Sequence, residues 1–176
     1  MRRIKFVLVY FILIINSSGC GKPESVSRVY TEADSILSLT LDLQSRIGSS
    51  EIQRMFEFQS EINTDMSVLK DLANEDTSLN RYRELSNELG HCMQACNQFH
   101  EEAFMLETSL REIMVISGEQ DADKEKLRKR LKYETEIYTD LYMRADSSLA
   151  LATLQAEIFY SLKPEIEKIK DQLKNP

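Results

Sequence analysis

Apolar residues recur at steps of three and four along most of this chain. This spacing is typical of helices that pack against one another along their whole length, because it keeps the apolar side chains on one narrow face. The pattern therefore predicts an all-α fold. The apolar series cover residues 26–47, 52–73, 82–113 and 127–173.

Residues that interrupt helices are rare. Between Pro23 and Pro164 there is no proline, and the only glycines are Gly48, Gly90 and Gly118. A sheet protein of this length needs many more turn residues. Good helix formers such as Leu, Glu and Lys are abundant instead. We expect an elongated antiparallel helical bundle or coiled coil.

The first two apolar series are out of phase with each other. The first ends at Ile47 and the second starts five residues later at Ile52, where the repeat requires a step of three or four. Gly48 lies in this gap, so we expect the first rod to be broken there. The second series predicts a buried seam made of Ile52, Met55, Gln59, Ile62, Met66, Leu69 and Ala73.

Two architectures fit these segments. If the chain bends only slightly at Gly48, three rods of about 60–75 Å form, at about 1.5 Å per residue. If the chain reverses there, four antiparallel helices form. We favour three rods because full-length partners bury the seams of both long helices, and Pro164 is expected to kink or interrupt the last one. The predicted helices are 25–47, 51–73, 77–117 and 121–173.

The first nineteen residues have the order of an export signal. Basic residues within 1–5 precede an apolar run at 6–15, and small polar residues follow at 16–19. The apolar run has ten residues, whereas a spanning helix needs about 20. We expect residues 1–19 to be removed as a signal peptide.

The sequence Ser17-Ser18-Gly19-Cys20 resembles the lipobox of bacterial lipoproteins. The resemblance implies that Cys20 is acylated and becomes the mature N-terminus, with residues 20–24 as a leader and 25–176 as the helical domain. It also implies a lipid-anchored protein of the cell envelope. Gly21 is not the aspartate that retains some lipoproteins at the inner membrane, so we expect an outer-membrane position facing the periplasm. An ordinary secretory signal or an internal apolar segment is the alternative.

Charge limits the partners of the mature chain. The full sequence has 22 Lys and Arg against 29 Asp and Glu, and the signal holds three of the basic residues and none of the acidic ones. The mature net charge is therefore 19 minus 29, or −10. Nucleic acid is not an expected partner. No cofactor is expected apart from the acyl lipid on Cys20.

The third helical segment carries a cluster of possible metal ligands. Cys92, Cys96 and His100 are spaced four residues apart, so they share one side of a helix, while His91 points farther away. Two thiolates and an imidazole are suitable ligands for zinc or copper(I). Core packing is favoured over both a metal site and a disulfide, because Cys92 and Cys96 fall on the uninterrupted apolar seam.

A basic island stands out in this acidic chain. In the three-rod architecture it returns to the membrane-proximal end and can contact anionic headgroups. The alternative is a solvated helix face paired with Glu125 and Glu134. The residues of the island are Lys124, Lys126, Arg128, Lys129, Arg130 and Lys132.

Motifs of catalysis are missing from the sequence: there is no Gly-x-Ser-x-Gly elbow, no phosphate-binding glycine loop and no His-Glu-x-x-His pair. We therefore expect a membrane-tethered helical interaction or scaffold protein without enzymatic activity, which binds another envelope protein or a second copy of itself. The alternative is a metal- or thiol-redox protein centred on Cys92 and Cys96. A weaker alternative is a small-ligand sensor.

Overall fold

The computed structural model describes residues 26–69, 76–119 and 121–174. These residues form helices and short connections, with no strand among them. The all-α prediction is confirmed. The helices are α2 (Val26–Ile47), α3 (Ser50–Leu69), α4 (Thr77–Ser117) and α5 (Lys124–Lys174).

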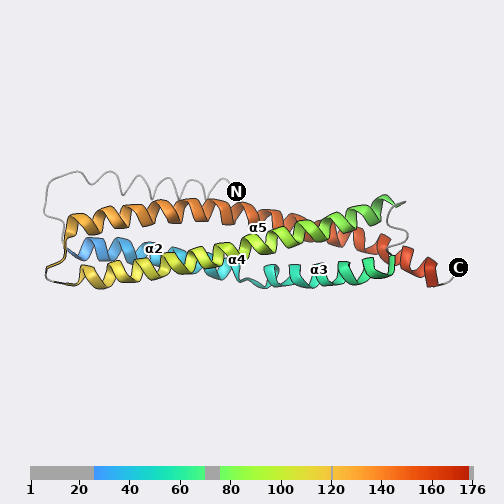
Figure 1. The fold of residues 1–176 in the computed structure, drawn as a ribbon, viewed down its shortest axis with the longest axis horizontal. Coiled ribbons are helices and arrows are strands. Elements are labelled where there is room, and N and C mark those ends of the chain that lie inside the picture. The colour runs from blue at the N-terminus through green and yellow to red at the C-terminus, as the bar shows by residue number, and fades with distance from the viewer. Residues whose placement is uncertain (1–25, 70–75, 120, 175–176) are drawn as a thin grey trace.

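Three rods make up the bundle (Figure 1). Helices α2 and α3 follow each other end to end, and α4 and α5 each pack against both of them as well as against each other. The chain bends at Gly48–Ser49 and continues in the same direction. The favoured three-rod architecture is therefore confirmed, and the four-helix alternative is not what forms.

Backbone hydrogen bonds connect Gly48 to the end of α2 and Ser49 to the start of α3. The amide of Gly48 donates to the carbonyl of Gln44 at 2.9 Å, and the carbonyl of Ser49 accepts from Ile52 at 3.1 Å and from Gln53 at 3.2 Å. The last carbonyls of α2 and the first amides of α3 thus find partners nearby, as helix ends require. This local bonding allows a change of phase without a reversal of the chain.

The buried side of α3 differs from its predicted seam. Phe58 and Asp65 are 7% and 5% exposed, whereas the predicted seam residues Gln59 and Met66 are only partly buried. The reason is tertiary: the ring of Phe58 stacks on Phe159 of α5 with centroids 4.3 Å apart. The ion-pairing partners of Asp65 also lie on α5. Because of these contacts, part of the buried face of α3 is shifted by one residue from the seam that a strict continuation of the repeat predicts.

Helix α5 continues through Pro164 without interruption. The expectation that this proline interrupts the last helix is wrong. Pro164 is exposed, so the carbonyl that loses its amide partner lies on the solvent side, where water can replace the missing donor. The packed face of α5 is preserved, and Ile166 remains fully buried.

We expect Leu110→Ala to lower the free energy of unfolding by about 2–5 kcal/mol, because truncating a buried leucine leaves a cavity. Leu110 in α4 is 0% exposed. Met105→Ala is the matched control on the same helix: Met105 is 71% exposed, and its loss should change stability by no more than about 0.5 kcal/mol. Urea denaturation followed by circular dichroism measures both. Equal losses of stability in the two variants would contradict the assignment of Leu110 to the buried side of α4 and of Met105 to its exposed side.

Candidate functional site

The most distinctive polar arrangement lies where α3, α4 and α5 meet, in the half of the rod farthest from Val26 (Figure 1). Five charged or polar side chains gather there around one buried carboxylate, that of Asp65. We call this group the Asp65 cluster. Its members are Glu61 and Asp65 from α3, Tyr82 from α4, and Lys163, Glu167 and Lys170 from α5.

Asp65 is at the centre of the cluster. The hydroxyl of Tyr82 donates to one carboxylate oxygen at 3.1 Å, and the ammonium of Lys163 lies 3.3 Å from the same oxygen. The ammonium of Lys170 donates to the other oxygen at 2.6 Å. The side chain of Asp65 is only 6% exposed. A buried charge is tolerated only when it is paired and hydrogen-bonded, and Asp65 meets both conditions.

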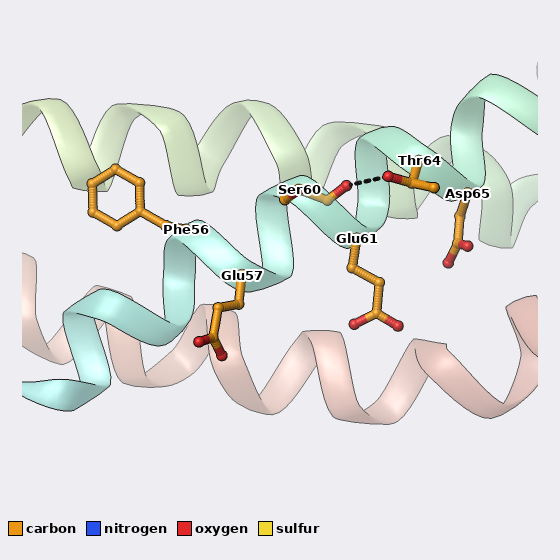
Figure 2. Close-up of a pocket in the computed structure, with 6 residues that line it drawn as sticks. All are labelled: Phe56, Glu57, Ser60, Glu61, Thr64 and Asp65. Carbon is orange, nitrogen blue, oxygen red and sulfur yellow. Dashed lines mark hydrogen bonds between the residues drawn. The ribbon is translucent and has the colours of Figure 1, made fainter.

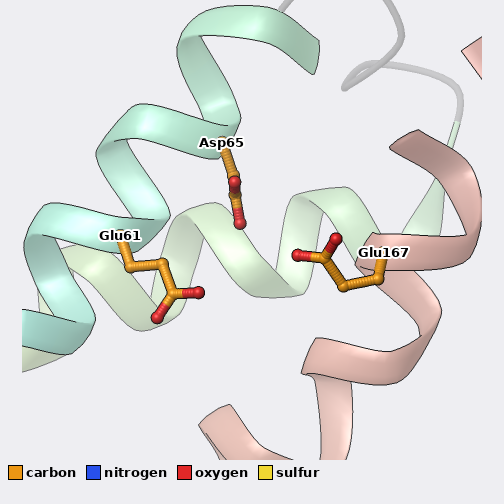
Figure 3. Close-up of side chains that lie close together, drawn as sticks. All are labelled: Glu61, Asp65 and Glu167. Atoms are coloured by element: carbon orange, nitrogen blue, oxygen red, sulfur yellow. The ribbon is translucent and has the colours of Figure 1, made fainter. Parts of the chain in front are cut away.

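Two further carboxylates surround the lysines. Glu167 accepts from Lys163 at 2.8 Å and from Lys170 at 3.0 Å, and Glu61 accepts from Lys163. Figure 3 shows Glu61 and Asp65 directed from α3 toward the space that Glu167 enters from α5. The cluster is therefore a network in which each lysine joins α5 to α3 and also pairs with a neighbour on its own helix.

This geometry changes the acidity of the members. Hydrogen bonds from Lys163 and then Lys170 lower the pKa of Glu167 to about 2. The hydrogen bond to Asp65 is the main reason that the pKa of Lys170 is raised. Burial alone would lower the pKa of Lys163, but its bonds to Glu167 and Glu61 outweigh burial and raise it. At neutral pH these charges are maintained.

Tyr82 stays protonated for a related reason. Burial raises its pKa, and the negative charge of Asp65 raises it further. A phenol in this position acts as a hydrogen-bond donor to the carboxylate and not as a base. Tyr82 therefore adds a third donor to Asp65 from α4, which ties all three rods together at one point.

Three carboxylates of the cluster have oxygen atoms within 4.8 Å of one another, which is close enough for a cation. They belong to Glu61, Asp65 and Glu167. The ammonium groups of Lys163 and Lys170 already pair with all three. A metal ion would have to displace two bound positive charges, so the arrangement is an internal ion-pair network.

An open hollow of about 540 Å³ lies on the outer side of α3, next to the cluster. In Figure 2 the ring of Phe56 points to one side of the helix, while Glu57 and Glu61 point to the other. The hydroxyl of Thr64 donates to the carbonyl of Ser60 at 2.8 Å, which satisfies it within α3. The hollow faces solvent and is not an enclosed cavity of the bundle core. Its lining residues are Phe56, Glu57, Ser60, Glu61, Thr64 and Asp65.

The cysteine and histidine cluster predicted on α4 does not converge. Cys92 and Cys96 are free thiols, 3% and 2% exposed, whereas His91 and His100 are exposed. Among the described residues, His100 and the two thiols do not bring ligand atoms within 4.8 Å of one another. The predicted imidazole ligand is therefore exposed, whereas the two thiols are in the core.

Both thiols are held in their protonated form. Burial raises the pKa of Cys92, and the charge of Glu88 raises it further. Burial also raises the pKa of Cys96, with a smaller contribution from Cys92. Metal binding and thiol exchange both need the thiolate, which this environment disfavours. The geometry is that of core cysteines.

The basic island is at the start of α5, at the same end of the rod as Val26 (Figure 1). Five of its six side chains are exposed, and Arg130 is partly buried. The carboxylate of Asp123 accepts from the amide of Lys126 at 3.0 Å and so begins the helix. The three rods therefore return the island to the end at which α2 begins, as expected for that architecture.

Some members of the island pair with carboxylates. Lys129 lies 2.8 Å from Glu125, as predicted, and Lys132 lies 3.9 Å from Glu136. Glu134, the other predicted partner, is instead buried and accepts from the hydroxyl of Ser109 at 2.5 Å. Within the described chain, neither Lys124 nor Lys126 has a carboxylate at ion-pair distance.

Arg130 turns inward from the island. Its guanidinium donates to Glu112 at 2.5 Å and to the hydroxyl of Ser109 at 3.0 Å, both on α4. This side chain joins α5 to α4 and is not positioned to contact a membrane surface. The exposed part of the island therefore consists of Lys124, Lys126, Arg128, Lys129 and Lys132.

Sequence reasoning missed the Asp65 cluster. A signal was present: Asp65 lies between Ile62 and Leu69 at a seam spacing, and Lys163, Glu167 and Lys170 repeat at steps of four and three on one helix face. The spacing does not show that Asp65 of α3 forms ion pairs with the lysines of α5. Cys20, with the predicted signal at 1–19 and leader at 20–24, lies outside the described residues.

Comparison of this chain with protein-family models, with curated proteins and with solved structures gives no significant match. Among the helices that the structure describes, none has the length and apolar character of a membrane span. A proposal for function therefore starts from the residues of this chain and their arrangement.

We expect Cys92 and Cys96 to react slowly with a thiol reagent in the folded protein and rapidly after denaturation, because burial limits access and the raised pKa values lower the thiolate fraction. Cys92→Ala and Cys96→Ala assign the two signals. Metal analysis of the same purified sample completes the test. Rapid labelling in the native state, or a stoichiometric soft metal, would support the redox or metal alternative instead.

Proposed function

We propose that this protein is a lipid-tethered helical scaffold of the bacterial cell envelope, without enzymatic activity. Acylated Cys20 attaches it to the membrane, preferably the outer membrane on its periplasmic side. The rod then binds another envelope protein or a second copy of itself. The resemblance of Ser17-Ser18-Gly19-Cys20 to a lipobox motivates the anchor.

The observation that carries this proposal is the direction in which the rod extends from the point where the chain enters it. Val26, six residues after Cys20, lies at the same end as the start of α5 (Figure 1). Helix α4 has 41 residues, so the packed region extends about 60 Å from that end. A chain held at Cys20 would therefore place its far end well away from its point of attachment, which suits a spacer or docking module.

The exposed part of the basic island supports a membrane-facing end. Its side chains project at the end where α2 begins, in a protein whose mature charge is negative. Each basic residue near an anionic lipid surface contributes about 1 kcal/mol. Contact with headgroups would add to the lipid anchor and orient the rod.

Large apolar side chains on the outer surface support a protein partner. Among the most exposed are Phe104 at 62%, Met105 at 71% and Val115 at 70%, all on α4. Tyr133 of α5 is 62% exposed. Aromatic residues and methionine are enriched in protein interfaces, so these positions are candidates for contact with a partner or a second copy.

In cells, cross-linking followed by affinity capture should recover either a defined envelope protein or a dimer of this chain, because the proposal requires a protein contact. Cys20→Ser is the matched control: it should release the protein from the membrane fraction and reduce the cross-link. Recovery of monomer and lipid alone would rule out the scaffold role. Retention of Cys20→Ser in the membrane fraction would rule out the lipid anchor.

Charge reversal with Arg128→Glu and Lys129→Glu should weaken binding of the Cys20→Ser form to phosphatidylglycerol vesicles by about tenfold or more, since two favourable contacts of about 1 kcal/mol each are lost. Vesicle sedimentation measures this. Arg54→Glu with Lys168→Glu makes the same charge change at exposed positions in the far half of the rod. If both double variants bind alike, the headgroup contact is disproved.

A further inference from the structure

Helices α2 and α3 form one rod, but different interactions hold each of them against α4 and α5. The buried polar residue of α2 is Thr40, whose hydroxyl donates to the carbonyl of Ile36 in the same helix at 2.8 Å. The ion pair of α2 with α5, Arg46 to Asp146 at 2.7 Å, is exposed. Exposed pairs contribute little to stability. Helix α2 also donates a hydrogen bond from Gln44 to Glu107 of α4 at 3.2 Å. Among the described residues of α2, however, no charged side chain is buried, so its attachment depends mainly on its apolar seam.

The attachment of α3 depends on charge as well. Its buried carboxylate, Asp65, is satisfied by groups on other helices: Tyr82 of α4, and Lys163 and Lys170 of α5. Removing one partner of a buried ion pair is strongly destabilising, because the remaining charge is left without compensation. The charge of Asp65 thus stabilises the packing of α3 against α4 and α5 while its partners are in place, and destabilises that packing once they are lost.

We infer that α3 is a charge-latched arm, which separates from α4 and α5 as a unit, while α2 stays packed, when the Asp65 cluster loses its ion pairs. This device goes beyond the scaffold role and does not depend on the lipid anchor or on a partner. Its failure in a test would leave the proposed function untouched.

The connection between α2 and α3 is suited to such a movement. Gly48 and Ser49 are the two residues between the helices, and α2 and α3 do not pack side by side. Among the described residues, Gly48 and Ser49 hydrogen-bond only through their backbone, to residues of the two adjoining helices. A change of backbone angles at two residues can therefore move α3 without disturbing the seam of α2.

Opening the arm would uncover an aromatic surface. Phe58 of α3 stacks on Phe159 of α5 at 4.3 Å, and the ring of Tyr82 lies 6.1 Å from Phe159. All three side chains are buried in the closed state, with exposures of 7%, 3% and 0% for Phe58, Phe159 and Tyr82. The latch thus makes access to this surface conditional on the charges around Asp65.

Acid is the natural trigger. The groups that face Asp65 are Glu61 from α3, Tyr82 from α4, and Lys163, Glu167 and Lys170 from α5. The pKa of Glu167 is lowered from 4.5 to about 2, so its stabilising contribution is present above pH 4.5 and is lost as the pH falls toward 2. The raised pKa values of Lys163 and Lys170 keep both lysines charged throughout that range.

Hydrogen exchange of the full chain tests this latch, with peptides from α2 and α3 compared in the same sample so that the intrinsic effect of pH cancels. Asp65→Asn should speed exchange of α3 by about tenfold or more at neutral pH, while α2 changes by less than about twofold. Asp146→Asn, which breaks the exposed ion pair of α2, is the matched control and should alter neither helix.

The wild-type chain provides a second measurement that does not depend on the folding of a variant. Lowering the pH from about 7 to about 3 should raise the ratio of α3 exchange to α2 exchange by about tenfold. In the triple variant Asp65→Leu, Lys163→Met and Lys170→Met, this acid response should disappear, because the variant lacks both the buried carboxylate and the two lysines that lower the pKa of Glu167.

Two results would overturn the inference. One is an Asp65→Asn chain whose α3 exchanges as slowly as the wild type. The other is simultaneous loss of protection in α2 and α3, in the variant or in acid, because that would show one cooperative bundle and not a separate arm. An acid response that persists in the triple variant would also exclude the Asp65 cluster as its source.

Discussion

The uninterrupted apolar seam of α4 is the constraint on which the rest of the structure depends. It extends over a helix of 41 residues, and each buried segment of it needs a partner of matching length. Neither α2, with 22 residues, nor α3, with 20, is long enough to cover it alone. Placed end to end, the two helices cover the seam, and α5 covers its other side.

The Asp65 cluster adds specificity to that apolar packing. If α3 folded back along α2, Asp65 would lie near the end occupied by Val26, away from Lys163 and Lys170. A buried carboxylate without partners is costly, so this charge disfavours the reversed arrangement. The same ion pairs that choose the direction of α3 also make its attachment sensitive to their loss. Selection of the topology and control of α3 therefore have one physical cause.

The two ends of the rod have different chemistry. The end near Val26 carries exposed basic side chains at the start of α5, and its Arg130 pairs inward with α4. The opposite half carries the paired charges around Asp65 and an aromatic contact between α3 and α5. The exposed basic side chains suit attachment to a membrane at the end near Val26. The Asp65 cluster suits regulated contact with a partner in the opposite half of the rod.

Local periodicity was sufficient to predict the helices, the break at Gly48 and the burial of Cys92 and Cys96, because each depends on residues close together in the sequence. It also favoured three rods, through the lengths of the segments. Only the tertiary structure decided that Phe58 and Asp65 replace Gln59 and Met66 in the buried face, that Pro164 leaves α5 uninterrupted, and that His100 is exposed while the thiols are buried. The reason is that a repeat specifies which side of a helix is buried, whereas the partners of a buried charge lie on other helices and are chosen only when those helices pack.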